Sequence, residues 1–315
     1  RDLHSFPTRR SSDLIAMKLL VTSLEQGLIF AILAMGVSIT YKVLDMADLS
    51  VEGTFPFGAF LFARFITMGL NPIVSTLLAF CIGSLAGLMT SVLFIKLKIR
   101  PLLAGILTMT MLYSINLRIN GKANIPLFSF DSIFDLGSVL VVLGLIILLI
   151  KILLDIFLKT ETGYLLIATG DNEALVRSLG ASSNKYKVIG LMLANGLVSL
   201  SGALMAQYQG FADITMGSSI IVVALASIII GDTLRKNSSL LKSTTRAILG
   251  AVIYKIIGGI AIDLGLSPND LKAISAIIVI VFIAYNNLAV DLIGIKAIKE
   301  RRDMHVKNSK PLKEF

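Results

Sequence analysis

Long apolar runs separated by short polar segments make up almost the whole chain. A membrane-spanning helix needs about 20 apolar residues, and most of the runs approach that length. We count about nine runs, with an uncertainty of one. The pattern predicts an all-α protein: a polytopic transmembrane helix bundle with about 8 to 10 membrane segments, including short or broken helices. The expected segments are residues 19–41, 55–68, 73–95, 102–117, 136–157, 188–205, 220–230, 247–262 and 274–290.

The second run, residues 55–68, is short and follows a polar break that contains Asp45, Asp48 and Glu52. Such a piece is either a discontinuous helix that lines a pathway or part of a plain loop between two spans. The pattern alone leaves both interpretations open.

The composition agrees with a membrane protein. Of 315 residues, 55% are hydrophobic and 16% are charged, with a net charge of +9, whereas soluble domains contain roughly 25% charged residues. Lys and Arg gather in residues 96–101, 159–187, 235–246 and 296–315. Asp predominates in residues 119–136, 210–217 and 263–270. By the positive-inside rule the first set is cytoplasmic, so the charge does not indicate a nucleic-acid partner. The side of the N-terminus stays open.

Three parts are expected along the chain. Residues 1–16 are polar and basic, precede Met17, and are expected to be a non-native or disordered tail. Residues 17–295 form the transmembrane domain, with a cytoplasmic loop at 159–187. Residues 296–315 form a basic cytoplasmic tail. The single cysteine excludes an internal disulfide framework.

Residues 163–187 predict a short polar helix with start and stop signals. Asp171 is expected to cap its start and Glu173 lies in its first turn. Arg177 lies near its end, and Gly180 can close it in the left-handed conformation.

This helix is expected to lie in water. Seven charged residues between 159 and 187 would cost about 20 kcal/mol in a bilayer centre, at about 3 kcal/mol each. Leu175, Val176 and Leu179 are expected on one face. The segment is therefore either a docking element for a soluble partner or an ordinary cytosolic loop with a helical turn.

The chain lacks the motifs of an enzyme that hydrolyses ATP or peptides. No nucleotide-binding loop occurs, and both histidines, His4 and His305, lie in the tails. No catalytic residue, metal ligand or cofactor is expected. Transport would therefore draw on a gradient or on a docked ATPase. The centres of the spans are expected to hold essentially no ionisable group, which favours the docked ATPase over a gradient-driven secondary carrier or channel.

Several segments, taken in order, resemble ABC-importer permeases of the branched-chain amino acid and ribose type. They include ATGDNEALVRSLGAS in the polar helix, Asn195, Gly202-Ala203, Gly210, Gly217 and the IIIGD ending at Asp232. Upstream, YKVLDMADLSVEGTFPFGAF resembles the family's polar segment after the first span. PLLAGILTMTMLYSINLRINGKANIPL resembles an uncharacterised subgroup often linked to amino-acid uptake. The helix departs from the E-A-A-x-x-x-G form of other importer permeases, since Leu175 follows Glu173-Ala174.

The resemblance implies a multi-pass permease in a bacterial inner membrane, surrounded by membrane lipid. It also implies a permease homodimer, a separate ATP-binding subunit that holds the ATP, and an extracytoplasmic solute-binding protein. The implied solute is an amino acid or a similar small polar molecule. The implied ATPase-coupling residues are Gly170, Asp171, Asn172, Glu173, Leu175, Arg177, Leu179 and Gly180. The charged ones would fix the register on the partner, and the two leucines would be buried there.

Six polar residues are candidates for the substrate pathway: Asp45, Asp48, Glu52, Asn116, Arg118 and Gln207. Each has an ordinary structural alternative. The acidic residues could be solvated in a loop, Arg118 could anchor at the interface, and Gln207 could form an interhelical hydrogen bond.

Overall fold

A computed structural model describes residues 8–234, 243–266, 273, 276–282 and 284. The expected segment 274–290 lies largely outside the described residues. Residues 1–7 and the expected tail 296–315 lie outside them entirely.

The described residues form helices joined by short connections. The helices are α1 (Thr8–Ser38), α2 (Val51–Thr67), α3 (Pro72–Ile95), α4 (Pro101–Asn120), α5 (Val139–Phe157), α6 (Glu161–Asp171), α7 (Glu173–Ser178), α8 (Ser183–Gln209), α9 (Ile220–Leu234) and α10 (Ser243–Asp263). Two short strands are β1 (Asn124–Pro126) and β2 (Phe211–Asp213). Single helical turns are η1 (Ile39–Val43, a π-helix), η2 (Ile133–Leu136) and η3 (Ile214–Gly217). α1 begins at Thr8, so residues 8–16 are helical, while the non-native origin expected for residues 1–16 stays a prediction.

Among the described residues, seven stretches are long and apolar enough to cross a membrane, which confirms the predicted polytopic helix bundle. The shorter α2, with 17 residues, falls below the length of a full span but is buried on nearly all sides. The expected boundaries of the described segments agree with the helices to within a few residues, with two exceptions. α1 begins at Thr8 rather than at residue 19, and α8 extends further at both ends than the expected 188–205.

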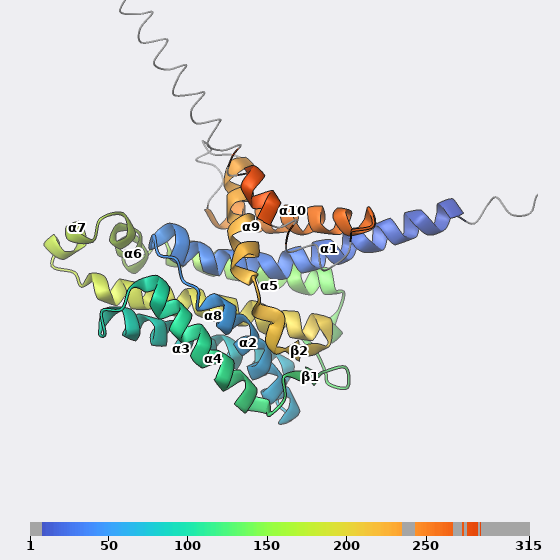
Figure 1. The fold of residues 1–315 in the computed structure, drawn as a ribbon, viewed down its shortest axis with the longest axis horizontal. Coiled ribbons are helices and arrows are strands. Elements are labelled where there is room, and N and C mark those ends of the chain that lie inside the picture. The colour runs from blue at the N-terminus through green and yellow to red at the C-terminus, as the bar shows by residue number, and fades with distance from the viewer. Residues whose placement is uncertain (1–7, 235–242, 267–272, 274–275, 283, 285–315) are drawn as a thin grey trace, which may run out of the picture.

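The connections lie at two opposite ends of the bundle (Figure 1). At one end β1 and β2 pair antiparallel, so the Asp-rich loops 119–136 and 210–217 lie together. At the other end lie α6 and α7. There Lys187 Nζ stands 5.2 Å from the centre of the Phe94 ring, which brings the start of α8 beside the end of α3.

The basic connections share the α6–α7 end. Lys42, at the end of η1, forms an ion pair of 2.7 Å with Asp232 on α9, and Arg246 on α10 lies 3.6 Å from the same carboxylate. By the positive-inside rule this end is expected to face the cytoplasm. α1 begins at the opposite end (Figure 1), so this rule would place the start of the first span on the extracytoplasmic side.

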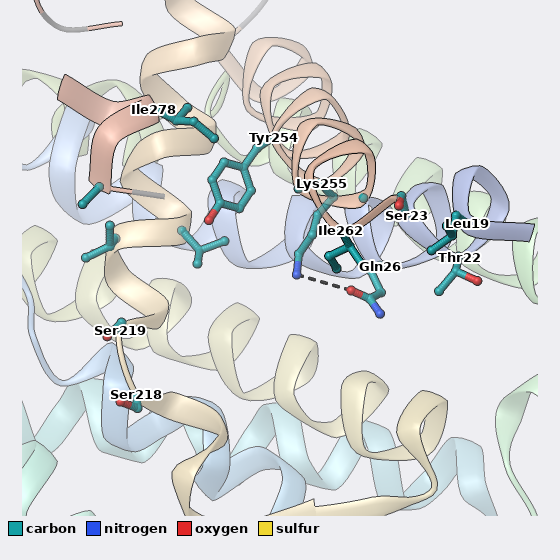
Figure 2. A pocket seen from close by; sticks show the side chains of 15 residues that line it. Leu19, Thr22, Ser23, Gln26, Ser218, Ser219, Tyr254, Lys255, Ile262 and Ile278 are labelled. Atoms are coloured by element: carbon teal, nitrogen blue, oxygen red, sulfur yellow. Dashed lines mark hydrogen bonds between the residues drawn. The ribbon is translucent and has the colours of Figure 1, made fainter. Parts of the chain in front are cut away.

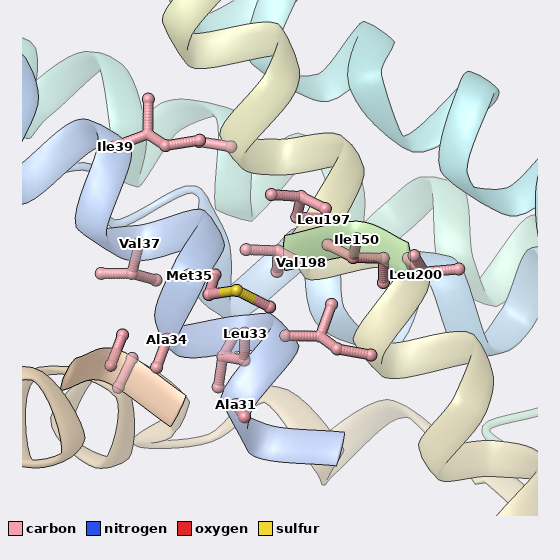
Figure 3. Packing of buried hydrophobic residues seen from close by; sticks show 14 of the residues in the cluster. Ala31, Leu33, Ala34, Met35, Val37, Ile39, Ile150, Leu197, Val198 and Leu200 are labelled. Carbon is pink, nitrogen blue, oxygen red and sulfur yellow. The ribbon is translucent and has the colours of Figure 1, made fainter. Parts of the chain in front are cut away.

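Helix α8 lies at the centre of the bundle and packs against its neighbours at glycines. A Cβ at Gly58 of α2 would lie 1.9 Å from Ser199 O, and one at Gly87 of α3 would lie 2.1 Å from Leu191 O. Only glycine permits helices to approach this closely. On another side of α8, Leu33 and Met35 of α1 pack against Val198 (Figure 3). α8 therefore contacts α1, α2 and α3 directly.

Candidate functional site

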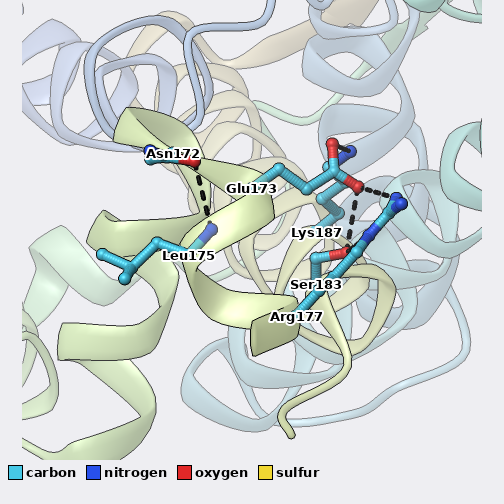
Figure 4. Close-up of polar contacts among 6 residues, drawn as sticks. All are labelled: Asn172, Glu173, Leu175, Arg177, Ser183 and Lys187. Carbon is cyan, nitrogen blue, oxygen red and sulfur yellow. Dashed lines mark hydrogen bonds and ion pairs between the residues drawn. The ribbon is translucent and has the colours of Figure 1, made fainter. Parts of the chain in front are cut away.

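The loop between α5 and α8 folds into two short helices. Thr160 caps α6, since its Oγ1 accepts the Gly163 N–H at 3.2 Å. Asn172 caps α7, since its Oδ1 accepts the Leu175 N–H at 3.1 Å (Figure 4). The expected cap, Asp171, is wrong: α6 runs through Asp171, so the cap moves to the next residue. Asp171 itself is exposed.

The end of α7 follows the sequence signal. Gly180 has a φ of +79°, the left-handed conformation expected for it. Its N–H donates to Arg177 O at 3.0 Å, and the Ala181 N–H donates to Val176 O at 3.2 Å. These bonds satisfy carbonyl groups that the helix end would otherwise leave without a partner.

Glu173 connects α7 to the start of α8. Its carboxylate accepts from Lys187 Nζ at 2.8 Å and from the Ser183 hydroxyl at 2.9 Å, and it forms an ion pair with Arg177 (Figure 4). The hydrogen bond from Lys187, with help from Ser183 and Arg177, lowers the pKa of Glu173 to about 2 against the opposing effect of partial burial. Glu173 and Arg177 therefore hold the loop together internally, a role that the sequence did not predict.

The apolar residues of α7 divide between two sides. Val176 is completely buried, whereas Leu175 is 50% and Leu179 is 67% exposed. Figure 4 shows Leu175 pointing away from the Glu173 cluster. The expectation that all three share one face is wrong, because Val176 packs into the hydrophobic core. We call Leu175 and Leu179 the outer face of α7. The two leucines therefore form a small exposed apolar surface beside a capped, cross-connected helix.

The loop rests directly on the backbone of η1. A Cβ at Gly170 would lie 1.8 Å from Val43 O, and one at Gly190 of α8 would lie 2.7 Å from Leu44 Cδ1. Gly170, expected on the ATPase side, therefore faces the bundle. α6 contacts the point where α1 ends and the break before α2 begins.

A buried polar cluster holds that break in place. Asp48 accepts the Ser50 N–H and the Asn195 Nδ2–H, both at 2.9 Å. Asn195 Oδ1 accepts from the hydroxyls of Ser50 at 3.1 Å and Thr54 at 2.7 Å. Residues 44–50 thus enter the bundle and are bound to α8, so the structure favours the discontinuous helix over the plain loop. Asn195 was not among the six predicted pathway residues. The sequence signal that could have indicated it is a single amide side chain within an apolar run.

The six predicted pathway residues do not converge on one site. Asp45 and Arg118 are exposed and Glu52 is partly buried. Asn116 is buried on α4, donates to Gly53 O at 3.3 Å, and its Oδ1 has no partner. Gln207 accepts the Ile133 N–H at 3.0 Å and donates to the Thr76 hydroxyl at 2.9 Å. Asn195 and Gln207 lie twelve residues apart on α8, about 18 Å at 1.5 Å per residue. The part of the six predicted residues in a substrate pathway stays a prediction.

The expectation that the spans hold essentially no ionisable group is wrong. Lys151 and Asp155 form an ion pair of 2.9 Å within α5. Glu25 of α1 accepts from the Tyr208 hydroxyl at 2.9 Å, and Lys255 lies in the middle of α10. Single charges escape notice because an apolar run keeps its average hydropathy when it contains one of them.

Comparison with known proteins decides the family. Residues 19–284 match the family described as "Branched-chain amino acid transport system / permease component". The chain belongs to this permease family. With its seven candidate spans, it is a multi-pass protein of the bacterial inner membrane.

Individual relatives cover most of the chain. A tyrosine transport system permease protein of Clostridioides difficile is 49% identical, over 87% of this chain and 93% of its own length. An uncharacterized protein of Rickettsia prowazekii is 37% identical, over 84% and 96%. A ribose import permease protein of Escherichia coli is 24% identical, over 84% of each. No solved structure matches the chain significantly.

Proposed function

We propose that this chain is the membrane-spanning permease subunit of an ATP-driven importer, coupled to a separate ATP-binding subunit through α7. The observation that carries the proposal is the outer face of α7: two exposed leucines at the basic end of the bundle, on a helix that Glu173 fixes to α8. An ordinary cytosolic loop has no need of such exposed apolar side chains on so well-connected a helix.

In this mechanism the outer face inserts into a groove of the ATP-binding subunit, which holds the ATP. Displacement of α7 passes to α8 through the bond between Glu173 and Lys187. It passes to η1 through the contact between Gly170 and Val43. Both routes end at the cluster of Asp48 and Asn195, where α1 and α2 are interrupted. Movement there would alternate access to the pathway.

The solute is an amino acid in this proposal. The support is the 49% identical relative, which is named as a tyrosine transport system permease protein. The extracytoplasmic solute-binding protein would deliver it at the β1–β2 end, opposite α7, and a second copy of the chain would complete the pathway between two permeases.

A gradient-driven carrier is the second candidate, and the ionisable groups inside the spans favour it. Lys255 and Glu25 both lie within helices that cross the membrane. Such groups commonly mark ion or proton routes. Uptake by the purified chain in liposomes, with no other subunit, would establish a carrier.

The decisive test replaces the outer face: Leu175→Glu together with Leu179→Glu. We expect the ATP-binding subunit to stop co-purifying with the permease and ATP-dependent uptake to fall by at least about tenfold, because a docking contact that costs 1.4 kcal/mol is worth tenfold in affinity. Leu97→Glu is the matched control, since Leu97 is also exposed, at 62%, in the loop between α3 and α4 at the same end. Full uptake by the double variant would refute coupling through α7.

A further inference from the structure

A cavity of about 430 Å³ lies between α1, α9 and α10, within the size range of small-molecule sites. Its walls include Gln26 of α1, Ser219 at the start of α9, and Tyr254, Lys255 and Ile262 of α10 (Figure 2). These positions belong to the first half of the α1 span, the start of α9 and the second half of α10. The cavity therefore lies in the extracytoplasmic half of the bundle, away from the α7 site.

Lys255 supplies the positive charge of this cavity. Its Nζ lies 3.8 Å from the centre of the Phe30 ring and 3.4 Å from Gln26 Oε1, toward which it points in Figure 2. The second distance is long for a hydrogen bond. In the described part of the chain, no carboxylate lies within 4.0 Å of Lys255. Glu25, the neighbour of Gln26, is directed to Tyr208 of α8 instead.

An ammonium group at this depth needs compensation. Charged side chains inside a membrane protein are costly and normally pair with an opposite charge. The chain follows this rule at Lys151 of α5, which pairs with Asp155 at 2.9 Å. At Lys255 an aromatic ring and an amide oxygen stabilise the positive charge only partly, compared with a negatively charged partner. The cavity beside it leaves room for an anion.

We propose that this cavity is a carboxylate-binding site. The ammonium of Lys255 binds the carboxylate of a small solute, and the hydroxyl and amide groups of the walls complete its shell. Val222, Val223 and Ile262 offer apolar contacts to the body of the solute. That the solute is a transported amino acid rests on the proposed function, whereas carboxylate binding by this chain does not.

The test uses the full chain in nanodiscs of phosphatidylcholine. The probes are L-tyrosine, L-leucine and L-alanine, each beside the amine that lacks its carboxylate: tyramine, isoamylamine and ethylamine. We expect at least one amino acid to bind about tenfold or more tightly than its amine, since hydrogen bonds to charged groups are worth that much. Lys255→Met should remove this preference and Lys255→Arg should keep it. Lys122→Met, which removes an exposed lysine at the same end, should change nothing.

Three results would overturn the site. In the first, no amino acid binds more tightly than its amine. In the second, the preference for the amino acid survives Lys255→Met. In the third, Lys255 retains phosphatidylglycerol, which excludes every probe, and the site is then one for a lipid headgroup. Uptake by the complete transporter separates this proposal from the proposed function. If the wild type imports an amino acid and Lys255→Met imports it with unchanged KM, the site fails and the function stands. If the complete transporter shows no ATP-dependent uptake but the chain binds carboxylates through Lys255, the proposed function fails and the site stands.

Discussion

Two carboxylates connect short elements to α8, and they do so in different surroundings. Glu173 joins α7 to the start of α8 in water, with Lys187 and Arg177 as cationic partners. Asp48 joins the break between α1 and α2 to the middle of α8, where it bonds to the neutral groups of Ser50 and Asn195.

The difference follows from the cost of charge. At the surface a second charge is well solvated and strengthens the connection, although salt and water limit its worth. In the interior, every unmatched polar atom costs its full desolvation free energy, so the number of hydrogen bonds decides stability. The buried connection should therefore be rigid and sensitive to substitution, and the surface connection should be tolerant.

The largest effect is expected at the buried connection. Asn195→Leu leaves an oxygen of Asp48 and the hydroxyls of Ser50 and Thr54 without their partner. A buried polar atom left without its partner typically costs about 1–3 kcal/mol, and Asn195 bonds to three side chains. We expect a clear fall in the thermal unfolding temperature of the detergent-purified protein. The double variant Asp48→Leu/Asn195→Leu should recover part of the loss, because the Asp48 carboxyl is then no longer buried without its amide partner. If the double variant loses as much stability as the two single variants added together, the bond between Asp48 and Asn195 contributes little.

A smaller effect is expected where the surface loop meets the buried break. Gly170→Ala places a methyl group 1.8 Å from Val43 O, so α6 must move away from η1. Such overpacking costs typically about 1–3 kcal/mol. We expect the ATP-binding subunit still to bind, because the outer face of α7 is unchanged, while uptake per ATP hydrolysed falls. Gly144→Ala on α5 is the matched control, since nothing lies within 4 Å of the added Cβ. Equal coupling in both variants would exclude this contact from the transmission route.

The sequence predicted local features well and long-range contacts poorly. Gly180 and the placement of Glu173 and Arg177 within α7 follow from start and stop signals that depend on neighbouring residues only. The apolar runs likewise give the spans. The pairing of β1 with β2 joins three-residue strands far apart in the chain, which no periodicity reveals. The bond between Asp48 and Asn195 and the contact of Gly170 with Val43 depend on tertiary packing, so the sequence alone could not indicate them. Lys255 is visible in the sequence, but the cavity beside it is not.

The smallest effect is expected at Glu173. A substitution there also tests how the stability of the loop depends on pH. Because its pKa is lowered from 4.5 to about 2, its contribution is complete above about pH 4.5 and is lost as the pH falls through about 2. Glu173→Gln should destabilise the loop by less than about 1 kcal/mol, since the group is a third exposed. Hydrogen exchange of residues 171–180 should therefore rise modestly in the variant. After correction for the intrinsic exchange rate, the difference from wild type should be the same at about pH 5 and about pH 8. A difference that grows between those two values would mean that Glu173 titrates there, and that Lys187 does not hold it as the geometry requires.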